Sequence, residues 1–376
     1  MSFGIYFHIP FCQTKCSYCH FVSMIFSQGM ADRYQKAVLE EMRSYPSDAE
    51  MEEVNSIYFG GGTPSLVPAE HITGVLRECR RRFRISDDCE VSLEANPGTL
   101  SAGKVAAYRD EGINRISLGA QSFVNQELSV IGRQHTAAMI EESIDLLRSH
   151  GFTNINLDLM LGLPMQTAES WRKNLETICR ISVPHISVYM LDLDDRCPLQ
   201  SLVADGSIRL PDDDFISDLY LETISFLSSQ GYQQYEISNF AYPGYACHHN
   251  LKYWMREPVH GFGLGSHSFD RDSRYANWSL IEDYLSAIES GRSPVSWRKT
   301  VTPAQALEET LFLGLRLAEG VDWRQLRSRY GDNNIMKYED SLRELSARGL
   351  LEWRDSVVRL TASGMLVSNE IFQLFV

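Results

Sequence analysis

The sequence predicts an α/β protein: a partial (β/α) barrel of the TIM type with about six strands, followed by a smaller, mainly helical C-terminal domain. Short runs of β-branched and aromatic residues alternate with longer amphipathic stretches between residues 5 and 191. This pattern changes after residue 210, where helices and one hairpin are expected. The length of 376 residues also exceeds that of one ordinary domain.

The first half of the chain predicts the barrel. Six strands are expected at residues 5–9, 56–59, 90–94, 115–118, 154–159 and 185–191. The helices between them are expected at residues 32–43, 69–82, 101–111, 139–150 and 168–180. Such alternation is typical of a mainly parallel sheet with crossover helices. A closed or partly open barrel fits the spacing better than a sandwich. A doubly wound open sheet remains an alternative, because periodicity does not determine closure.

The second half begins with a different pattern. Three aspartates at 212–214 favour the start of a helix that reaches residue 229, since carboxylates stabilise helix N-termini. A strand pair is expected around residues 233–239 and 261–269. We therefore divide the chain into a barrel (1–230), a barrel extension (231–300) and a C-terminal domain (301–376).

The C-terminal domain has the pattern of a winged helix. From residue 303 three helices are expected, then a hairpin at 349–353 and 357–360, and a last helix. Winged helices often bind DNA, but the interpretation as a structural cap is favoured. The only basic residues near the hairpin are Arg343, Arg348, Arg354 and Arg359.

Composition excludes several classes of protein. With 44% hydrophobic and 22% charged residues the chain is an ordinary globular protein rather than a disordered or fibrous one. No apolar run approaches the ~18 residues that cross a bilayer. The first ten residues carry no Lys or Arg, so no signal peptide is expected and the predicted location is the cytoplasm. A net charge of −14 argues against nucleic acid as a partner.

Three of the eight cysteines crowd into one short segment after the first predicted strand. Cys12, Cys16 and Cys19 form the pattern C-x3-C-x2-C. Three thiolates at this spacing can hold three irons of a [4Fe–4S] cube and leave the fourth iron open. Zinc would want a fourth ligand, and His20 would have to fold back sharply to supply it. Three buried thiols are the remaining alternative.

Further polar and glycine-rich segments follow the other predicted strands. The segment GGGTP at 60–64 lets the backbone approach a charged ligand closely. Glu94, Gln121, Arg133 and Asp158 stand at or after the ends of the next strands. Because the C-terminal ends of barrel strands carry the ligand site, these residues are expected at one mouth.

Together, the cysteine pattern and GGGTP resemble the radical S-adenosylmethionine (SAM) superfamily. The resemblance implies that SAM chelates the open iron of the cluster. It implies that Gly61, Gly62 and Thr63 meet the SAM amino group and that Glu94 and Arg133 lie near its methionine part. Gln121 and Asp158 would surround its ribose and adenosine. Two tyrosines that flank the cysteines, Tyr6 and Tyr18, are expected to line the cofactor.

Within this superfamily the chain resembles the oxygen-independent coproporphyrinogen III oxidase-like branch. The segments YEISNFA at 235–241 and NLDLMLGLP at 156–164 carry the resemblance. The true dehydrogenase of this branch has a further cysteine where Phe21 stands, and a long arm before its cluster, whereas eleven residues precede Cys12 here. Both differences speak against porphyrinogen decarboxylation.

A second motif is similar to that of the haem chaperones of this branch, the HemW family. His249, Asn250, Tyr253 and Trp254 form H-N-x-x-Y-W. Imidazole is the common protein ligand of haem iron, and aromatic rings offer flat surface to a porphyrin. His248 is an adjacent competitor for the iron. The resemblance thus implies haem near His249, in addition to the cluster and SAM.

The function that these motifs favour is a haem carrier that delivers haem to respiratory haem proteins. A coproporphyrinogen dehydrogenase is one alternative. A radical SAM methyltransferase or cyclopropanase is another, but such enzymes have no reason to retain H-N-x-x-Y-W. The sequence leaves open whether SAM is turned over, whether the chain forms a homodimer, and whether it touches a membrane transiently through a partner.

Overall fold

The computed structural model describes residues 2–45, 53–195 and 197–375, and it confirms the predicted α/β class. Six parallel strands stand side by side in chain order, which is the arrangement of a partial barrel. They are β1 (Ser2–Ile9), β4 (Glu53–Gly61), β5 (Arg84–Ala95), β6 (Arg115–Gln121), β7 (Asn154–Leu161) and β8 (His185–Met190).

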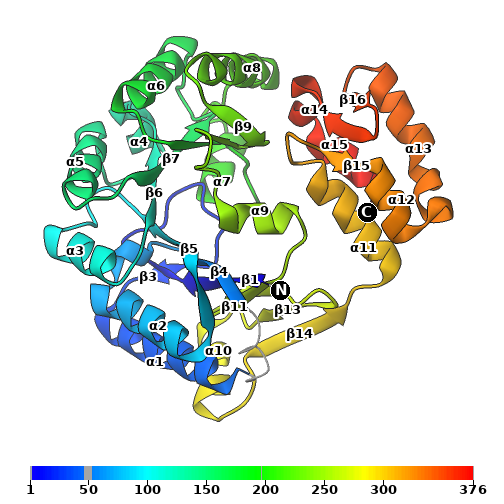
Figure 1. Cartoon of the computed structure of the whole chain (residues 1–376). Coiled ribbons are helices and arrows are strands. Elements are labelled where there is room, and N and C mark those ends of the chain that lie inside the picture. Colours follow the sequence, from blue (N-terminus) through cyan, green and yellow to red (C-terminus); the bar gives the residue numbers. More distant parts are fainter. Residues whose placement is uncertain (1, 46–52, 196, 376) are drawn as a thin grey trace.

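Helices surround this sheet on its outer side, as Figure 1 shows. The ring contains α1 (Gln28–Ser44), α2 (Ala69–Arg82), α3 (Ala102–Asp110), α4 (Asn125–Val130), α5 (Ala137–Ser149), α6 (Ala168–Ile181) and α8 (Asp213–Ser229). The buried Trp171 indole of α6 donates to Thr223 of α8 at 2.8 Å, which joins two neighbours of the ring. Because the six strands follow one another in chain order, without the reversal that marks a doubly wound sheet, that alternative does not hold.

The sheet extends beyond the six strands at both edges. β11 (Val259–Phe262) runs parallel to β1 and is followed by antiparallel β12 (His267–Phe269), β13 (Ser273–Asn277) and β14 (Val295–Thr300). At the other edge β10 (Asn239–Ala241) joins β8, and β9 (Gln233–Glu236) joins β10. The described residues thus form one sheet of twelve strands, whose end strands β14 and β9 do not pair with each other. The barrel remains open.

The expected pairing of residues 233–239 with 261–269 is wrong. β9 pairs with β10, whereas β11 lies at the far side of the sheet against β1. The physical reason is that β1 and β8 each present a free edge to the solvent once the six strands have formed. Each edge needs a partner, and the two segments cover different edges.

A buried carboxylate fixes the β11–β13 extension to the barrel. Glu41 of α1 accepts hydrogen bonds from the Gly263 amide (2.8 Å), the Asn277 side-chain amide (2.6 Å) and the Tyr284 hydroxyl (2.7 Å). Tyr284 belongs to α10 (Ile281–Glu289). Burial raises the pKa of Glu41 to about 7, because the charged form loses its hydration.

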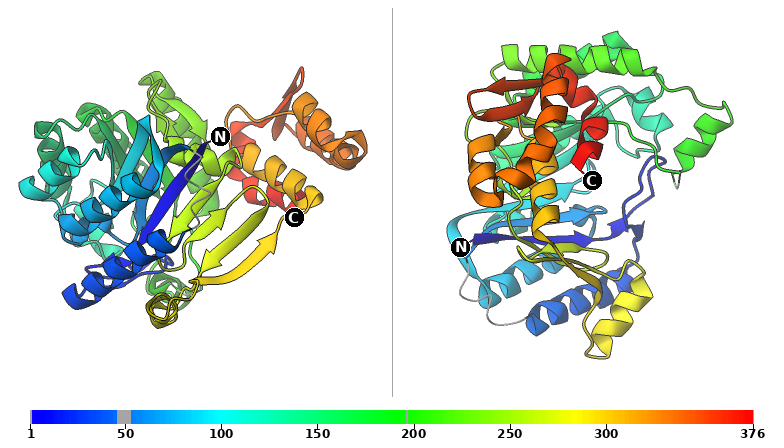
Figure 2. Two further views of the ribbon diagram at one scale, coloured as in Figure 1. Left: turned by 60° about the horizontal axis from the view of Figure 1, so that its bottom comes forward. Right: turned by 90° about the vertical axis from the view of Figure 1, so that its right-hand side faces the viewer.

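The C-terminal part confirms the expected run of helices with one hairpin. It consists of α11 (Pro303–Gly314), β15 (Val321–Asp322), α12 (Trp323–Tyr330), α13 (Asp332–Ala347), β16 (Leu351–Arg354), β17 (Val357–Leu360), α14 (Ala362–Leu366), α15 (Ser368–Phe372) and the 3-10 turn η3 (Gln373–Phe375). Its three strands form a small sheet of their own. Figures 1 and 2 show this part beside the ring, on the side where the barrel is open.

Short elements complete the two ends of the barrel. β2 (Phe11–Cys12), β3 (Met24–Ile25), η2 (Pro64–Leu66) and α7 (Pro198–Ala204) belong to the end where the parallel strands finish, and α9 (His248–Trp254) belongs to the end where they begin. In the right-hand view of Figure 2 the N-terminus and the green α7 lie at opposite sides of the molecule. No helix in the described ranges has the length and apolar content that crossing a bilayer requires.

Candidate functional site

A cavity of about 370 Å³ lies where the parallel strands end. All of the predicted cluster and SAM residues except Tyr6 line this cavity. They are Cys12, Cys16, Tyr18, Cys19, Gly61, Gly62, Thr63, Glu94, Gln121, Arg133 and Asp158. The topology explains why residues so far apart in sequence meet, because parallel strands bring their C-terminal ends to one mouth.

The three cysteines lie on one loop between the end of β1 and the start of α1. The Cys19 amide donates to the Cys16 carbonyl (3.2 Å), so residues 16–19 form a tight turn. The Ser17 amide donates to the Ile131 carbonyl (3.3 Å), which holds this turn against the end of α4. Burial raises the pKa of the Cys12 and Cys19 thiols, so both must release a proton before they bind iron.

The cysteine loop fits a cube better than a single ion. Within the described ranges, no three His, Cys, Asp or Glu side chains lie close enough to share one metal ion. In a [4Fe–4S] cube each thiolate binds its own iron, so the cysteines need to border a space rather than meet at one point. Cys12, Cys16 and Cys19 all border the cavity, and His20 lies exposed at its rim.

The GGGTP segment packs directly against the start of the cysteine loop. The Gly62 amide donates to the Ile9 carbonyl and the Thr63 amide to the Phe11 carbonyl, both at 2.8 Å. A Cβ atom on Gly62 would lie 2.8 Å from the Phe11 carbonyl oxygen, so only glycine fits there. Gly61 has a φ of +110°, which side chains rarely adopt. The close approach of these two backbone segments therefore requires the glycines, whether or not they also contact a ligand.

A carboxylate without a strong cationic partner lines the cavity at Glu94. One oxygen accepts the Tyr58 hydroxyl (2.9 Å) and the other accepts the Gly61 amide (3.1 Å). Burial, and then the charge of Asp158, raises the pKa of Glu94 to about 7. A ligand cation beside Glu94 would therefore be stabilised by an anion that lacks compensation.

Arg133 offers the opposite charge. Its guanidinium donates to the Asn96 side-chain oxygen (3.0 Å) and lies 5.9 Å from the centre of the Tyr18 ring. Its Nε atom is buried and has no hydrogen-bond partner among the residues that the structure describes. Buried donors of this kind are rare unless a ligand completes them, and guanidinium matches a carboxylate. Glu94 and Arg133 together fit a ligand that carries both an ammonium and a carboxylate group.

Asp158 and Gln121 form the wall of the cavity on β7 and β6. Asp158 accepts hydrogen bonds from the Asn156 side-chain amide (2.8 Å) and the Ser117 hydroxyl (3.3 Å), while burial raises its pKa. Gln121 has a φ of +64° at the point where the β6–β7 register shifts. Such a conformation is uncommon for a residue other than glycine and is typical of functional sites.

Tyr6 does not line the cavity. Its hydroxyl lies 3.1 Å from His8 Nδ1, and its ring stacks on those of Tyr58 (6.3 Å) and His249 (6.4 Å). Tyr6 therefore belongs to an aromatic layer inside the barrel, between the cavity and α9.

The H-N-L-K-Y-W segment forms α9, which crosses the ring at the end where the strands begin (Figure 1). His249 is 1% exposed. Its Nδ1 lies 2.9 Å from the Ser56 hydroxyl, and its Nε2 lies 3.1 Å from the Tyr253 hydroxyl. Burial lowers the pKa of His249 to about 3, so the ring is neutral. Coordination of iron by His249 would require one of these hydrogen bonds to open.

The other residues of the motif differ in exposure. Tyr253 is 37% exposed, and the preceding His248 is exposed as well. Asn250 and Trp254 are half-buried. The Arg316 guanidinium lies 4.4 Å from the centre of the Trp254 ring, which ties α9 to the end of α11. The outer surface of α9 thus presents Tyr253 and His248, while His249 faces the barrel interior.

Two carboxylates hold the ends of α9. Glu90 of β5 accepts the His248 amide (3.0 Å), the His249 amide (3.1 Å) and the Cys247 thiol (3.3 Å), as an anion at a helix N-terminus does. At the other end Arg256 donates to Glu309 of α11 at 2.6 Å.

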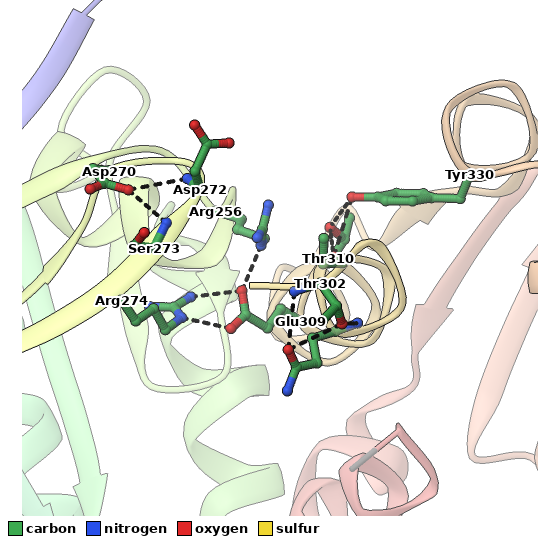
Figure 3. A network of polar contacts seen from close by, with 11 residues as sticks. Arg256, Asp270, Asp272, Ser273, Arg274, Thr302, Glu309, Thr310 and Tyr330 are labelled. Atoms are coloured by element: carbon green, nitrogen blue, oxygen red, sulfur yellow. Dashed lines mark hydrogen bonds and ion pairs between the residues drawn. The ribbon is translucent and has the colours of Figure 1, made fainter. Parts of the chain in front are cut away.

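The Glu309 contact belongs to a larger network, which Figure 3 shows. Arg274 of β13 donates to both oxygens of Glu309, at 2.6 and 3.0 Å. The guanidinium groups of Arg256 and Arg274 each lie 4.6 Å from the centre of the Phe269 ring. Glu309 therefore anchors the C-terminal part both to α9 and to the sheet extension, in addition to the contact between Arg316 and Trp254.

Sequence reasoning missed several residues of the cavity. Tyr58 and Asn96 hold Glu94 and Arg133, and Tyr189 and Met190 end β8 at the rim. Asn96 was detectable, because it stands two residues after Glu94 and shares its side of the strand. Tyr189 and Met190 were detectable from the rule on strand ends. Tyr58 gave no signal, since it lies within a strand.

Comparisons with known proteins agree with this geometry. The radical SAM superfamily model matches residues 6–178, and the HemN C-terminal domain model matches residues 301–367. The chain is 33% identical over 370 residues to the "Heme chaperone HemW" of Lactococcus lactis, with 98% of this chain and 96% of that protein covered. It is 34% identical over 371 residues to the protein of the same name from Bacillus subtilis, with 98% of each covered.

One solved structure shares the fold of almost the whole chain. The coproporphyrinogen III oxidase HemN from Escherichia coli superposes with a TM-score of 0.87, over 99% of this chain and 89% of that one. Its sequence identity to this chain is 23%, so this similarity concerns the fold.

Proposed function

Because this chain belongs to the HemW family of the radical SAM superfamily, we propose that it is a haem chaperone, which binds haem and delivers it to haem-dependent proteins. The observation that carries the proposal is the near full-length identity of 33–34% to proteins named haem chaperones. The matched span covers 98% of this chain and so includes the segment that forms α9.

The superfamily's cofactors are a [4Fe–4S] cluster and SAM, and the cavity residues fit both. When bound, the cluster can supply an electron to the sulfonium C–S bond of SAM. We assign Cys12, Cys16 and Cys19 to the cluster. Glu94 suits the ammonium group of SAM, and the unpaired Nε of Arg133 suits its carboxylate. The remaining wall residues would orient the nucleoside and exclude water.

We place haem at α9, on His249, Asn250, Tyr253 and Trp254. The motif supports this site, and so does the aromatic surface of Tyr253 and Trp254. The burial of His249 implies that haem binding opens α9, because both imidazole nitrogens are engaged. His248 is the exposed competitor for the iron. The barrel, extension and C-terminal boundaries at residues 230 and 300 are proposed with this assignment.

Enzymatic turnover of a porphyrinogen is the second candidate. The fold similarity to the E. coli oxidase favours it, but Phe21 stands where that enzyme class is expected to carry a further cysteine. Phe21 lines the cavity and is 59% exposed. We therefore favour carriage of haem over catalysis. Methyl transfer or cyclopropanation lacks a supporting observation.

One experiment separates these functions. Anaerobically reconstituted protein is incubated with SAM, a reductant and coproporphyrinogen III, and the tetrapyrroles are separated by chromatography. A carrier leaves coproporphyrinogen unchanged, yet gives a Soret band with haem and transfers that haem to an apo haem protein. Formation of protoporphyrinogen would overturn the proposal. A methylated product on another substrate would favour the third function.

The expected partners and location follow from this proposal. We propose respiratory haem proteins as acceptors, with transient contact to a membrane through them and a homodimer as the assembled form. We propose the cytoplasm as its location, and the acidic composition speaks against nucleic acid as a partner.

A further inference from the structure

One side chain lies between the cavity and α9 and contacts the functional groups of both. Tyr58 lies on β4 and lines the cavity. Its hydroxyl donates to Glu94 at 2.9 Å. Its ring stacks on that of His249, with ring centres 5.1 Å apart and an interplanar angle of 26°. Tyr58 therefore contacts Glu94, which we assign to SAM, through its hydroxyl, and His249, which we assign to haem, through its ring.

The cavity end of this contact is sensitive to a bound cation. Within the described part of the chain, the Glu94 carboxylate accepts one further hydrogen bond, from the Gly61 amide, and the charge of Asp158 acts on it most strongly. An ammonium group that enters the cavity competes with the neutral Tyr58 hydroxyl for the same carboxylate oxygen. The Tyr58 hydroxyl carries no charge, whereas an ammonium group adds the attraction of an ion pair to its hydrogen bond with the carboxylate, so the cation is favoured.

At α9, the His249 imidazole is not accessible to haem while Tyr58 keeps its position. Ser56 and Tyr253 engage the two ring nitrogens of His249, and the Glu90 carboxylate accepts its amide. The Tyr58 ring lies against a face of the imidazole. Displacement of this ring removes the nearest ring contact of His249 and leaves its hydrogen bonds, the edge-on Tyr253 ring (5.3 Å) and the more distant Tyr6 ring (6.4 Å).

We propose that Tyr58 is a positioning residue that couples SAM binding in the cavity to the release of His249 for haem. SAM draws Glu94 away from the Tyr58 hydroxyl, the Tyr58 ring leaves His249, and α9 opens. The coupling rests on the proposed function, because it requires that haem binds at α9. Linkage is reciprocal, so haem binding increases SAM affinity by the same factor.

The test is a haem titration of reconstituted protein, followed by Soret absorbance, with and without saturating SAM. No reductant is added, so SAM is not consumed. In the wild type, SAM is expected to lower the apparent Kd for haem by about fivefold or more, the size typical of coupling between sites. In Tyr58→Phe, which keeps the ring but loses the bond to Glu94, the ratio of the two Kd values should approach one.

Tyr45→Phe is the matched control. Its hydroxyl is also hydrogen bonded to a histidine, His260 Nδ1 at 2.8 Å, and Tyr45 lies outside the residues that line the cavity. This variant should keep the wild-type ratio. Iron analysis establishes that each variant carries its cluster, and equilibrium dialysis establishes that it binds SAM.

The outcomes separate the two proposals. A wild-type ratio within twofold of one overturns the coupling, and this measurement needs no variant. An undiminished ratio in Tyr58→Phe overturns the role of Tyr58. If the wild type binds no haem under either condition, the haem chaperone proposal fails, and the coupling fails with it.

Discussion

His249 and Tyr253 hydrogen bond to each other across one turn of α9, with 3.1 Å between the Nε2 atom and the hydroxyl. Residues four apart on a helix are neighbours, so the spacing within H-N-x-x-Y-W places the two groups together by itself. This hydrogen bond joins two residues of the same motif to each other. It also means that the two residues most suited to haem stabilise α9 in the structure described here.

Replacement of a cluster cysteine should abolish the cluster. Cys12→Ala, Cys16→Ala and Cys19→Ala each leave two thiolates, which are too few to hold three irons of the cube. Iron and sulfide analysis and visible absorption after anaerobic reconstitution provide the measurement. Cys179→Ala, a half-buried cysteine of α6, should keep full iron and sulfide. A triple variant that retains both would contradict the assignment.

Replacement of His249 should weaken haem binding. We expect His249→Ala to raise the Kd for haem by about tenfold or more, equal to about 1.4 kcal/mol, because the iron loses its ligand. His248→Ala is the matched control, since it removes an exposed neighbouring imidazole. Soret titrations of both variants give the answer. An unchanged titration for His249→Ala would remove the haem assignment from that residue, and a loss confined to His248→Ala would transfer it.

Removal of Glu309 should destabilise the attachment of the C-terminal part. The Arg256 side chain is 7% exposed and that of Glu309 is 15% exposed, so Glu309→Ala leaves a buried guanidinium without its partner. The expected loss of unfolding free energy is about 3 kcal/mol. Urea denaturation measures it.

An exposed ion pair supplies the comparison for Glu309. The side chains of Arg33 and Glu282 are 39% and 68% exposed, so water screens the pair and its loss should cost little stability. Equal losses in Glu309→Ala and Glu282→Ala would show that the contact with α9 contributes little.

Stability should decrease between pH 4.5 and pH 7 because of Glu41. Its pKa is about 7 in the folded protein against 4.5 ordinarily, so the folded state binds more protons in this range. The unfolding free energy therefore falls as pH rises, by up to about 3 kcal/mol for this group. Glu94 acts in the same direction. Glu41 and Glu94 together set how steeply the unfolding free energy falls with pH. In Glu41→Gln this slope should be about half of the wild-type contribution from the two groups.

The slope is obtained from urea denaturation at several pH values. Glu40→Gln, an exposed neighbour on the same helix, should keep the wild-type slope. A slope that is unchanged in Glu41→Gln would mean that Glu41 has the same proton affinity in the folded and unfolded states.

Much of the barrel could be predicted because its signals are local. The predicted strands lie within the observed ones at five of six positions, and the sixth, at residues 185–191, ends one residue later than β8. The helix predicted at residues 69–82 coincides with α2. Hydrophobic period and turn residues are encoded over a few neighbours, so one sequence is enough to find them. Partners of the edge strands depend on residues far apart in the chain, and that prediction failed for β9 and β11.

The same distinction divides the site. The sequence by itself identified residues that line one cavity, because the spacing of Cys12, Cys16 and Cys19 and the glycines of GGGTP are local patterns. Only the tertiary structure decided how those residues are used. It buried His249 with both nitrogens engaged, moved Tyr6 out of the cavity wall, and placed Tyr58 between Glu94 and His249. Burial and hydrogen bonding are properties of groups brought together by folding, and no spacing along the chain encodes them.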